Sequence, residues 1–351
     1  MQMDVVRHSI QRAFESDILD DVGFSIVWHS GEPLTLPISY YNEANKILGE
    51  VRAKYPKRAR MPVSFSFQTN GTMINSEWCD LFEKLDAKVC VSVDGPAFLH
   101  DNQRVFRSGR GSHDLVVRGI SLLRERHIQF SVIVVLTKNS LKYPDEIYNF
   151  LKEMGVKNVG FNIDEADGVR TESSFLASDE LDHELYAAFF SRLWDLCEAD
   201  RWNLAVREFD RTRWYILGGL HHAEGNQSRP FTIVTVTYDG SYSTFSPELV
   251  SVDPNGPSFV IGNVLTTSFI DAQNSNQYLE MLSEINSGIS LCESQCEYFD
   301  LCGGGAPSNK LSENGTFASQ ETAYCKFGTQ IMTDIVLTKL ESIENGTTTA
   351  R

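Results

Sequence analysis

Four cysteines near the C-terminal end of the sequence form the residue set with the clearest chemistry. They are Cys292, Cys296, Cys302 and Cys325, with three, five and twenty-two residues between successive members. Four thiolates complete the ligand set of either a tetrahedral zinc ion or a [4Fe-4S] cluster, and spacing alone does not distinguish the two. Three glycines follow Cys302, a loop composition that inert buried cysteines do not require. The pattern predicts a metal or iron–sulfur site.

The remaining cysteines, Cys79, Cys90 and Cys197, are scattered along the chain. Each lies within a helical or strand-like pattern, so we expect them to be small core residues without a metal. The total of seven thiols is odd, and four of them are grouped in a short stretch. This distribution favours metal ligation over a framework of disulfides.

Polar, glycine-bearing turns follow the first three predicted strands, at residues 28–34, 68–72 and 92–96. In parallel βα architectures the carboxyl ends of the strands bind ligands, because loops and helix N-termini converge there. Any one of these turns, taken alone, is also typical of simple chain reversal, since Asn-Gly and Asp-Gly are common turn dipeptides. Three of them at successive strand ends favour one shared pocket.

In order along the chain, the three turns resemble the strand-end motifs of radical S-adenosylmethionine (SAM) enzymes. The first is similar to the family's Gly-Gly-Glu-Pro turn, with Ser30 in place of the first glycine, which implies that Glu32 holds the SAM amino group. The second and third resemble motifs whose Asn and Ser line the SAM pocket. The resemblance assigns to SAM binding the residues Ser30, Gly31, Glu32, Pro33, Asn70, Ser92 and Asp94.

The segment from Cys296 to Cys325 resembles the SPASM-type domain of peptide-modifying maturases, especially those that form cyclophane crosslinks in ribosomally made peptides. The resemblance implies oxidative crosslinking, in which a radical derived from SAM abstracts hydrogen from a peptide side chain and the surplus electron passes to an auxiliary cluster. It further implies a precursor peptide as substrate and an electron donor protein as partner. The ligands of one auxiliary [4Fe-4S] cluster would be Cys292, Cys296, Cys302 and Cys325.

Two departures from the family pattern stand out. Family members begin with a strand and a loop of three cysteines, spaced by three and two residues, and the sequence contains no such loop. We therefore expect a chain that lacks the first barrel strand and the SAM-cleaving cluster, through a truncation or a miscalled start. SAM binding would be impaired and the chain inactive as given. The alternative is a non-catalytic paralogue that binds a peptide and holds iron–sulfur or zinc.

The second departure concerns relatives with two auxiliary clusters, which carry further cysteines where this chain has Phe245 and Ala306. One auxiliary cluster is therefore expected. The catalytic aspartate of those relatives aligns near Ser246, so its role does not transfer to this chain. The nearby carboxylate of Glu248 is the candidate catalytic group.

The elements that must position these residues form an α/β pattern, in which short apolar runs alternate with amphipathic helical stretches over residues 1 to about 165. We expect residues 1–225 to form a partial (β/α)6 radical SAM-type barrel missing its first strand, and residues 226–351 to form a SPASM-type domain. A helix with Ser178 as its N-cap is expected to close the first domain. The predicted strands are Phe24 to Trp28, Val63 to Phe67, Lys88 to Val93, Gln129 to Leu136 and Asn158 to Ile163.

The composition limits the classes of partner and the location that the protein can have. The 351 residues carry 47 acidic and 31 basic side chains, a formal charge of -16, which disfavours nucleic acid as a partner because affinity for phosphate comes mostly from Lys and Arg. No apolar run approaches the roughly 20 residues of a membrane helix. Charges near Met1 replace the apolar stretch of a secretion signal, so we expect a cytoplasmic protein with no membrane partner.

Overall fold

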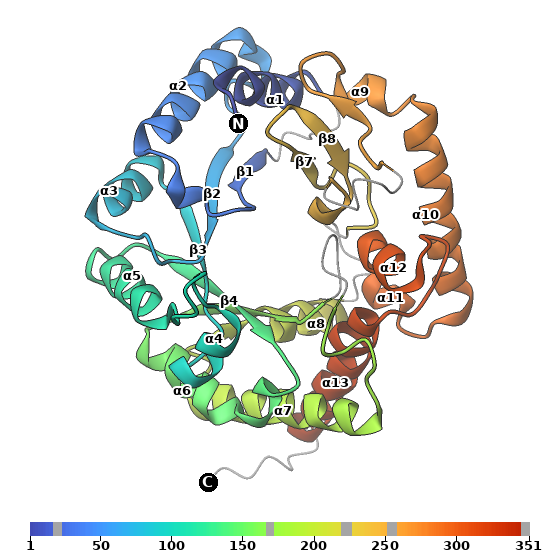
Figure 1. The fold of residues 1–351 in the computed structure, drawn as a ribbon. Helices are drawn as coiled ribbons and strands as arrows, with labels where there is room; N and C mark the ends of the chain where they lie inside the picture. The colour runs from blue at the N-terminus through green and yellow to red at the C-terminus, as the bar shows by residue number, and fades with distance from the viewer. Residues whose placement is uncertain (17–22, 166–171, 219–226, 251–257, 345–351) are drawn as a thin grey trace.

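The computed structural model describes residues 1–16, 23–165, 172–218, 227–250 and 258–344. In these ranges the elements form a ring, with β1 to β4 and the helices α2 to α6 on one side and the C-terminal elements on the other (Figure 1). The helices α8 and α13 lie where the two sides meet (Figure 1).

One sheet of six parallel strands, in the order β1-β2-β3-β4-β5-β6, forms the first side of the ring. The five strands predicted from sequence are present, and the two-residue β6 is an addition. In the described residues β1 pairs only with β2 and β6 only with β5, so the sheet is an open, partial barrel. The strands are β1 (Phe24–Trp28), β2 (Val63–Thr69), β3 (Lys88–Ser92), β4 (Phe130–Leu136), β5 (Asn158–Ile163) and β6 (Ala205–Val206).

Helices alternate with the strands and cover the outer face of the sheet (Figure 1). They are α1 (Met3–Glu15), α2 (Ile38–Lys54), α3 (Ser76–Leu85), α4 (Ala97–Gln103), α5 (His113–Glu125), α6 (Pro144–Glu153), α7 (Glu180–Ala199) and α8 (Arg207–Gly218). Short 3₁₀ turns lie at η1 (Pro33–Thr35), η2 (Pro56–Arg58) and η3 (Ser140–Lys142).

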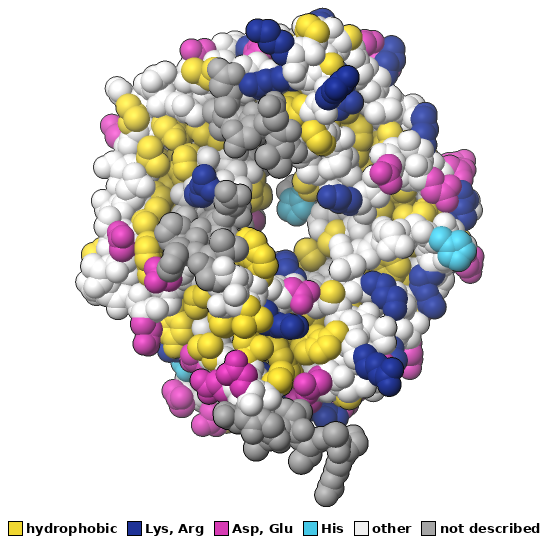
Figure 2. Space-filling model, turned by 180° about the vertical axis from the view of Figure 1, so that it is seen from behind, with side chains coloured by type: hydrophobic (Ala, Val, Ile, Leu, Met, Phe, Trp, Pro, Cys, Tyr) yellow, Lys and Arg dark blue, Asp and Glu magenta, His cyan; other side chains and the backbone are white. Residues whose placement is uncertain are grey.

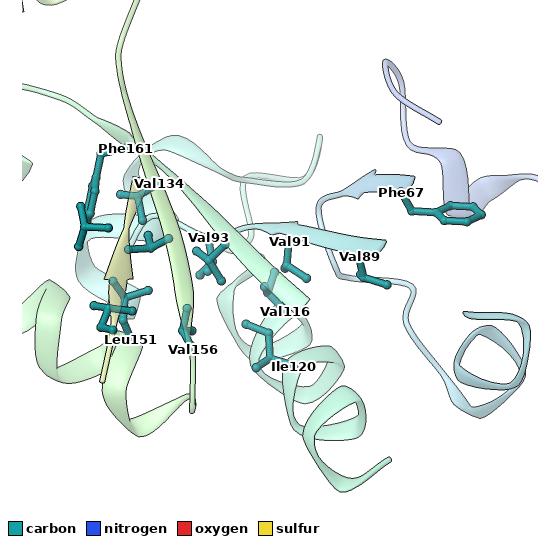
Figure 3. Packing of buried hydrophobic residues seen from close by; sticks show 14 of the residues in the cluster. Phe67, Val89, Val91, Val93, Val116, Ile120, Val134, Leu151, Val156 and Phe161 are labelled. Carbon is teal, nitrogen blue, oxygen red and sulfur yellow. The ribbon is translucent and has the colours of Figure 1, made fainter. Parts of the chain in front are cut away.

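The core between sheet and helices is built from β-branched strand residues and aliphatic helix residues. Figure 3 shows Val91 of β3 near Val116 and Ile120 of α5, and all three are fully buried. Burying each side chain of this kind stabilises the fold by about 1.5–3 kcal/mol. The helix-covered face of the sheet is the more apolar one, since burial alternates along β2 and β4 and the polar residues of β2 lie on the less buried face.

Helix α7 starts one residue later than the sequence suggested. Asp179, not Ser178, is the N-cap, and it forms a reciprocal capping box with Asp182. On this helix Trp194 is buried whereas Leu181 is 61% exposed. A carboxylate cap with a second carboxylate three residues later satisfies two backbone N–H groups, which decided the start of the helix.

The second side of the ring combines a small antiparallel sheet with short helices. A hairpin is formed by β7 (Val234–Val236) and β8 (Ser241–Thr244), and β8 also pairs with β9 (Gly262–Asn263). The other elements are η4 (Pro247–Val250), α9 (Phe269–Ala272), α10 (Asn276–Gln295), α11 (Phe299–Cys302), α12 (Pro307–Asn314), the π-helical η5 (Cys325–Ile331) and α13 (Met332–Glu344).

Packing crosses the expected boundary at 225–226 in both directions. Val5 and Ala13 of α1 belong to the hydrophobic cluster of the C-terminal region, while Phe327 and Met332 belong to the barrel cluster. The division into two domains stays a prediction, and its two halves share side chains at both ends. Within the described ranges no helix combines the length and the apolar character that a membrane crossing needs.

Candidate functional site

The turn after β1 is tied to the end of β2 by Glu32. One carboxylate oxygen of Glu32 accepts the Thr69 hydroxyl at 2.6 Å and the Leu34 N–H at 3.0 Å. The other accepts the backbone N–H of Asn70 at 2.7 Å. Ser30 and Gly31 precede Glu32 with positive φ angles of 67° and 61° and lie exposed. The first and second predicted turns are therefore in direct contact.

Asn70 and Ser92 continue this arrangement to the next strand. The Asn70 side-chain oxygen accepts both the backbone N–H and the hydroxyl of Thr72, which leaves its amide nitrogen without a partner among the described residues. Ser92, the last residue of β3, accepts the Gln68 amide of β2 at 3.0 Å. An amide donor and a hydroxyl thus lie on adjacent strands at the same edge of the sheet.

Asp94 is held by its neighbours on several sides. It is buried, and its carboxylate accepts two bonds from Arg104, at 2.6 and 3.2 Å, and one from the backbone N–H of Val135 at 2.9 Å. Its own N–H is bound by the imidazole of His100. Asp94 therefore joins the ends of β3 and β4 to α4.

The three predicted turns lie along one edge of the sheet, as the parallel-strand rule requires. Beside Asp94 is a cavity of about 210 Å³, smaller than the 300–1,000 Å³ typical of ligand pockets. Two apolar side chains, Leu99 and Val135, line this cavity. The polar residues that line it are Asp94, Asn102, Gln103, Thr137, Asn139 and Ser140.

The four clustered cysteines come from three helices and one helix end. Cys292 is on α10 and is 8% exposed, Cys296 is the C-cap of the same helix, Cys302 ends α11 and Cys325 begins η5. The Cys296 backbone N–H binds the Cys292 carbonyl at 2.8 Å. The glycine-rich sequence after Cys302 is typical of a loop. In the structure Cys296, Cys302 and Cys325 lie at helix ends, and Cys292 lies within α10.

Electrostatics shows that these thiols are neighbours. Burial raises the pKa of Cys302, and the nearby Cys292 and Cys296 raise it further, while backbone N–H groups of its glycine loop oppose the shift. Burial likewise raises the pKa of Cys325 to about 12, with Cys302 and Cys296 adding to the effect. The Cys302 and Cys325 thiols therefore become anions more readily if a cation or cluster is present to balance the charge.

The described residues form no compact site for a single ion. A tetrahedral zinc–sulfur bond of about 2.3 Å places sulfurs about 3.8 Å apart. In the described part of the chain no group of three or more His, Cys, Asp or Glu side chains is gathered tightly enough for a single metal ion.

Nitrogen donors surround the sulfurs. The ammonium of Lys310 lies 3.4 Å from Cys292 Sγ, the Gln330 amide lies 3.7 Å from Cys325 Sγ, and backbone N–H groups approach Cys302. Donors of this kind stabilise thiolates that carry net negative charge in a cluster. The donor set therefore fits an anionic iron–sulfur group.

Comparison with known proteins agrees with both halves of the chain. A family model described as the radical SAM superfamily matches residues 15–151. The uncharacterized protein sll1766 of Synechocystis sp. is 40% identical over 344 residues, covering 97% of this chain and 85% of that protein. The chain belongs to the radical SAM superfamily. The serine-type anaerobic sulfatase-maturating enzyme of Bacteroides thetaiotaomicron is 25% identical over 326 residues, covering 89% of this chain and 75% of the enzyme.

Solved structures extend the shared fold over the whole ring. Native anSMEcpe with bound AdoMet and Cp18Cys peptide matches with a TM-score of 0.76 and 21% identity, covering 99% of this chain and 92% of that chain. Streptococcus suis SuiB bound to S-adenosylmethionine matches with a TM-score of 0.60 and 14% identity, covering 92% and 70% respectively. The partial barrel and the C-terminal region are thus combined as in radical SAM enzymes of this fold.

In this radical SAM protein, Phe245, Ser246 and Ala306 occupy the positions that were expected to differ from relatives with two auxiliary clusters. Phe245 is fully buried in the C-terminal cluster with φ of 75°, and Ser246 is buried with its hydroxyl bound by Ser308 at 3.0 Å. Ala306 is the N-cap of α12. Glu248 lies half-buried on η4, and its catalytic role stays a prediction.

Proposed function

We propose that the protein is of the radical SAM/SPASM type that oxidatively crosslinks a ribosomally made precursor peptide, and that this chain is itself inactive because its sequence contains no three-cysteine loop for the SAM-cleaving cluster. SAM binds at the turns after β1, β2 and β3, one auxiliary [4Fe-4S] cluster binds the four cysteines, and a separate electron donor protein supplies reducing equivalents. The observation that carries the proposal is the group of neighbouring cysteine thiols with N–H donors directed at the sulfurs.

In this proposal the barrel side of the ring binds SAM and the C-terminal side holds the cluster. Asn70 offers an amide donor and Ser92 a hydroxyl at the sheet edge, while Glu32 fixes the first turn against the second. Cys292, Cys296, Cys302 and Cys325 would hold the cluster, which supplies one-electron chemistry when bound. Carboxyl ends of parallel strands are the usual ligand-binding edge, which supports placing SAM there.

The C-terminal region contacts the barrel beyond the end of β5. The Asn309 amide of α12 donates to the Glu165 carboxylate at 2.5 Å, just beyond the carboxyl end of β5. Seen from behind, the space-filling view has an opening at the centre of the ring with hydrophobic side chains on part of its rim (Figure 2). A peptide at this opening would lie between the sheet edge and the C-terminal region.

The names of related proteins support the substrate class. Sulfatase-maturating enzymes are among the relatives, and two solved structures of this fold contain a Cp18Cys peptide or the precursor peptide SuiA. A peptide substrate for this chain is inferred by analogy of fold.

Metal content tests the cluster half of the proposal. Protein purified and reconstituted without oxygen should contain about four iron and four sulfide per chain, as expected for one Cys-ligated cluster. Cys302→Ser and Cys325→Ser should lose most of this iron. Cys90→Ser, a thiol on β3, is the matched control and should keep it. Zinc without iron in the wild-type protein would contradict the cluster.

SAM and peptide assays test the catalytic half. A version of the protein supplied with the family's three-cysteine loop should bind SAM, form 5'-deoxyadenosine and lower the mass of its precursor peptide by two hydrogen atoms per crosslink, whereas this chain should not cleave SAM by itself. Glu32→Gln should weaken SAM binding, whereas Glu43→Gln on the exposed face of α2 should not. Peptide binding without any SAM cleavage by the version with the loop would favour the alternative of a non-catalytic peptide-binding paralogue.

A further inference from the structure

Lys310 is a buried lysine beside the cysteine group. It lies on α12 and is 4% exposed, an unusual position for a residue type that is almost never fully buried without a partner. Its ammonium donates to the Gly288 carbonyl at 3.0 Å and lies 3.4 Å from Cys292 Sγ. Both contacts are on α10, so Lys310 ties α12 to the helix that carries the first cysteine.

The ammonium has no carboxylate partner within the described part of the chain, where Lys310 forms no ion pair. A buried charge without a counter-charge costs several kcal/mol, so the surroundings must supply negative charge. The carbonyl of Gly288 contributes only a dipole. Cys292 is the contacting group that can carry a full negative charge, as a thiolate ligand.

The neighbouring glycine leaves room for this contact. A Cβ at residue 288 would lie 3.2 Å from the Lys310 ammonium and 2.1 Å from the Phe317 carbonyl oxygen. Gly288 therefore allows α10 to approach both the ammonium and the loop before Cys325.

We propose that Lys310 is a positioning residue that raises the reduction potential of the auxiliary cluster through an N–H···S bond to its Cys292 ligand. This inference rests on the proposed cluster at the four cysteines. Reduction adds one electron to the cluster, and both a hydrogen bond to a ligand sulfur and a nearby positive charge stabilise that extra negative charge. Lys310 is neither oxidised nor reduced.

The Gln330 amide makes the comparable but weaker contact. It is neutral, lies 3.7 Å from Cys325 Sγ and also donates to the Glu321 carboxylate at 2.8 Å. Charge-assisted hydrogen bonds are roughly twice as strong as neutral ones, so Lys310 should have the larger influence. Replacing each residue separately distinguishes a specific effect of Lys310 from a general effect of donors near the sulfurs.

The test is an anaerobic redox titration of the reconstituted full chain with dithionite, followed by electron paramagnetic resonance. Lys310→Met removes charge and donor, and Lys310→Gln keeps an N–H donor without charge. At a fixed applied potential we expect the ratio of reduced to oxidised cluster to fall about tenfold in Lys310→Met, which is about 59 mV for one electron. Lys310→Gln and Gln330→Leu should give smaller shifts in the same direction.

Lys46→Met is the control for net charge, because Lys46 is an exposed residue of α2 in the barrel, and its potential should equal that of the wild type. An unchanged potential in Lys310→Met, with iron and sulfide intact, overturns the inference and leaves the cluster proposal standing. Loss of the cluster from both Lys310 variants also overturns it, because Lys310 would then hold the site together instead of tuning it. Wild-type protein without iron and sulfide would reject the proposed cluster itself.

Discussion

The Glu32 carboxylate accepts the Asn70 backbone N–H at 2.7 Å, although the two residues are 38 positions apart. The bond joins the turn after β1 to the turn after β2, which are parallel neighbours in the sheet. Because Glu32 also accepts from Thr69 and Leu34, one side chain organises both turns.

Replacing Glu32 by alanine should therefore destabilise the barrel edge. Three hydrogen bonds to a carboxylate are lost, and at half-buried positions we expect the free energy of unfolding to fall by about 2 kcal/mol. Urea denaturation measures the change. Glu43→Ala, which removes an exposed carboxylate paired with Lys46, should alter the same quantity by less than about 0.5 kcal/mol. Equal effects of the two substitutions would refute the organising role of Glu32.

The contact between Glu32 and Asn70 shows why much of the barrel side was predictable. Strands such as β1 and β5 are short, strongly apolar runs, and their expected bounds match those observed. Parallel strands end at one edge, so polar turns after consecutive strands must meet. The two-residue β6 has no such run, and pairing with β5, not its own sequence, makes it a strand.

Other parts of the site depend on contacts between residues that a local sequence pattern cannot predict. The partner of Asp94 is Arg104, brought to it by the path of α4, and the partner of Cys292 is Lys310, brought to it by the packing of α12 on α10. The four cysteines were predicted as a set because ligand chemistry requires four. Their placement at helix ends was not, since residues 276–295 lack a strong apolar stripe.

Removing one partner of the buried ion pair between Asp94 and Arg104 should lower the free energy of unfolding strongly. The Asp94 side chain is 5% exposed and that of Arg104 is 28% exposed. Arg104→Met leaves a buried carboxylate uncompensated, so we expect a loss of about 3 kcal/mol in unfolding free energy. Chemical denaturation of the single variants and of Arg104→Met with Asp94→Asn provides the test. If the double variant is as unstable as the sum of the singles, the two residues do not interact as described.

His100 should make the barrel sensitive to acid. Burial lowers the pKa of His100 from 6.5 to about 4, and its ring accepts the Asp94 N–H while contacting the Ser112 hydroxyl at 2.9 Å. The unfolded chain binds a proton near pH 6.5 and the folded chain does so only near pH 4, so stability falls as pH decreases through this window. The loss attributable to His100 is up to about 3 kcal/mol.

His100→Asn isolates this effect, because its amide oxygen can still accept the Asp94 N–H while the group no longer titrates. The variant should be less stable than wild type at neutral pH, and the difference should narrow as the pH falls from 6.5 to about 4. Thermal denaturation at several pH values measures the difference. Parallel pH profiles for the two proteins would contradict the assignment.

The rate of alkylation should distinguish the fully buried cysteines from the half-buried ones. Cys79 and Cys197 are fully buried, and burial raises the pKa of Cys197 to about 12, so native protein should leave both unmodified. In metal-free protein the half-buried Cys296 should react first, and cluster assembly should then protect it. Mass spectrometry after brief iodoacetamide treatment identifies the modified residues. Protection of Cys296 without any metal would argue against an accessible ligand set.

Gly288→Ala tests the packing that brings Lys310 to Cys292. Alanine normally favours a helix over glycine by about 1 kcal/mol, but a Cβ here would lie 2.1 Å from the Phe317 carbonyl oxygen. Because the obstructing atom is backbone, α10 must shift, and overpacking of this kind costs about 1–3 kcal/mol. We therefore expect lower thermal stability and a lower iron content after reconstitution. Ser287→Ala, at the exposed neighbouring position of α10, should change neither, and equal stability of the two variants would show that α10 and the Phe317 loop are not in close contact.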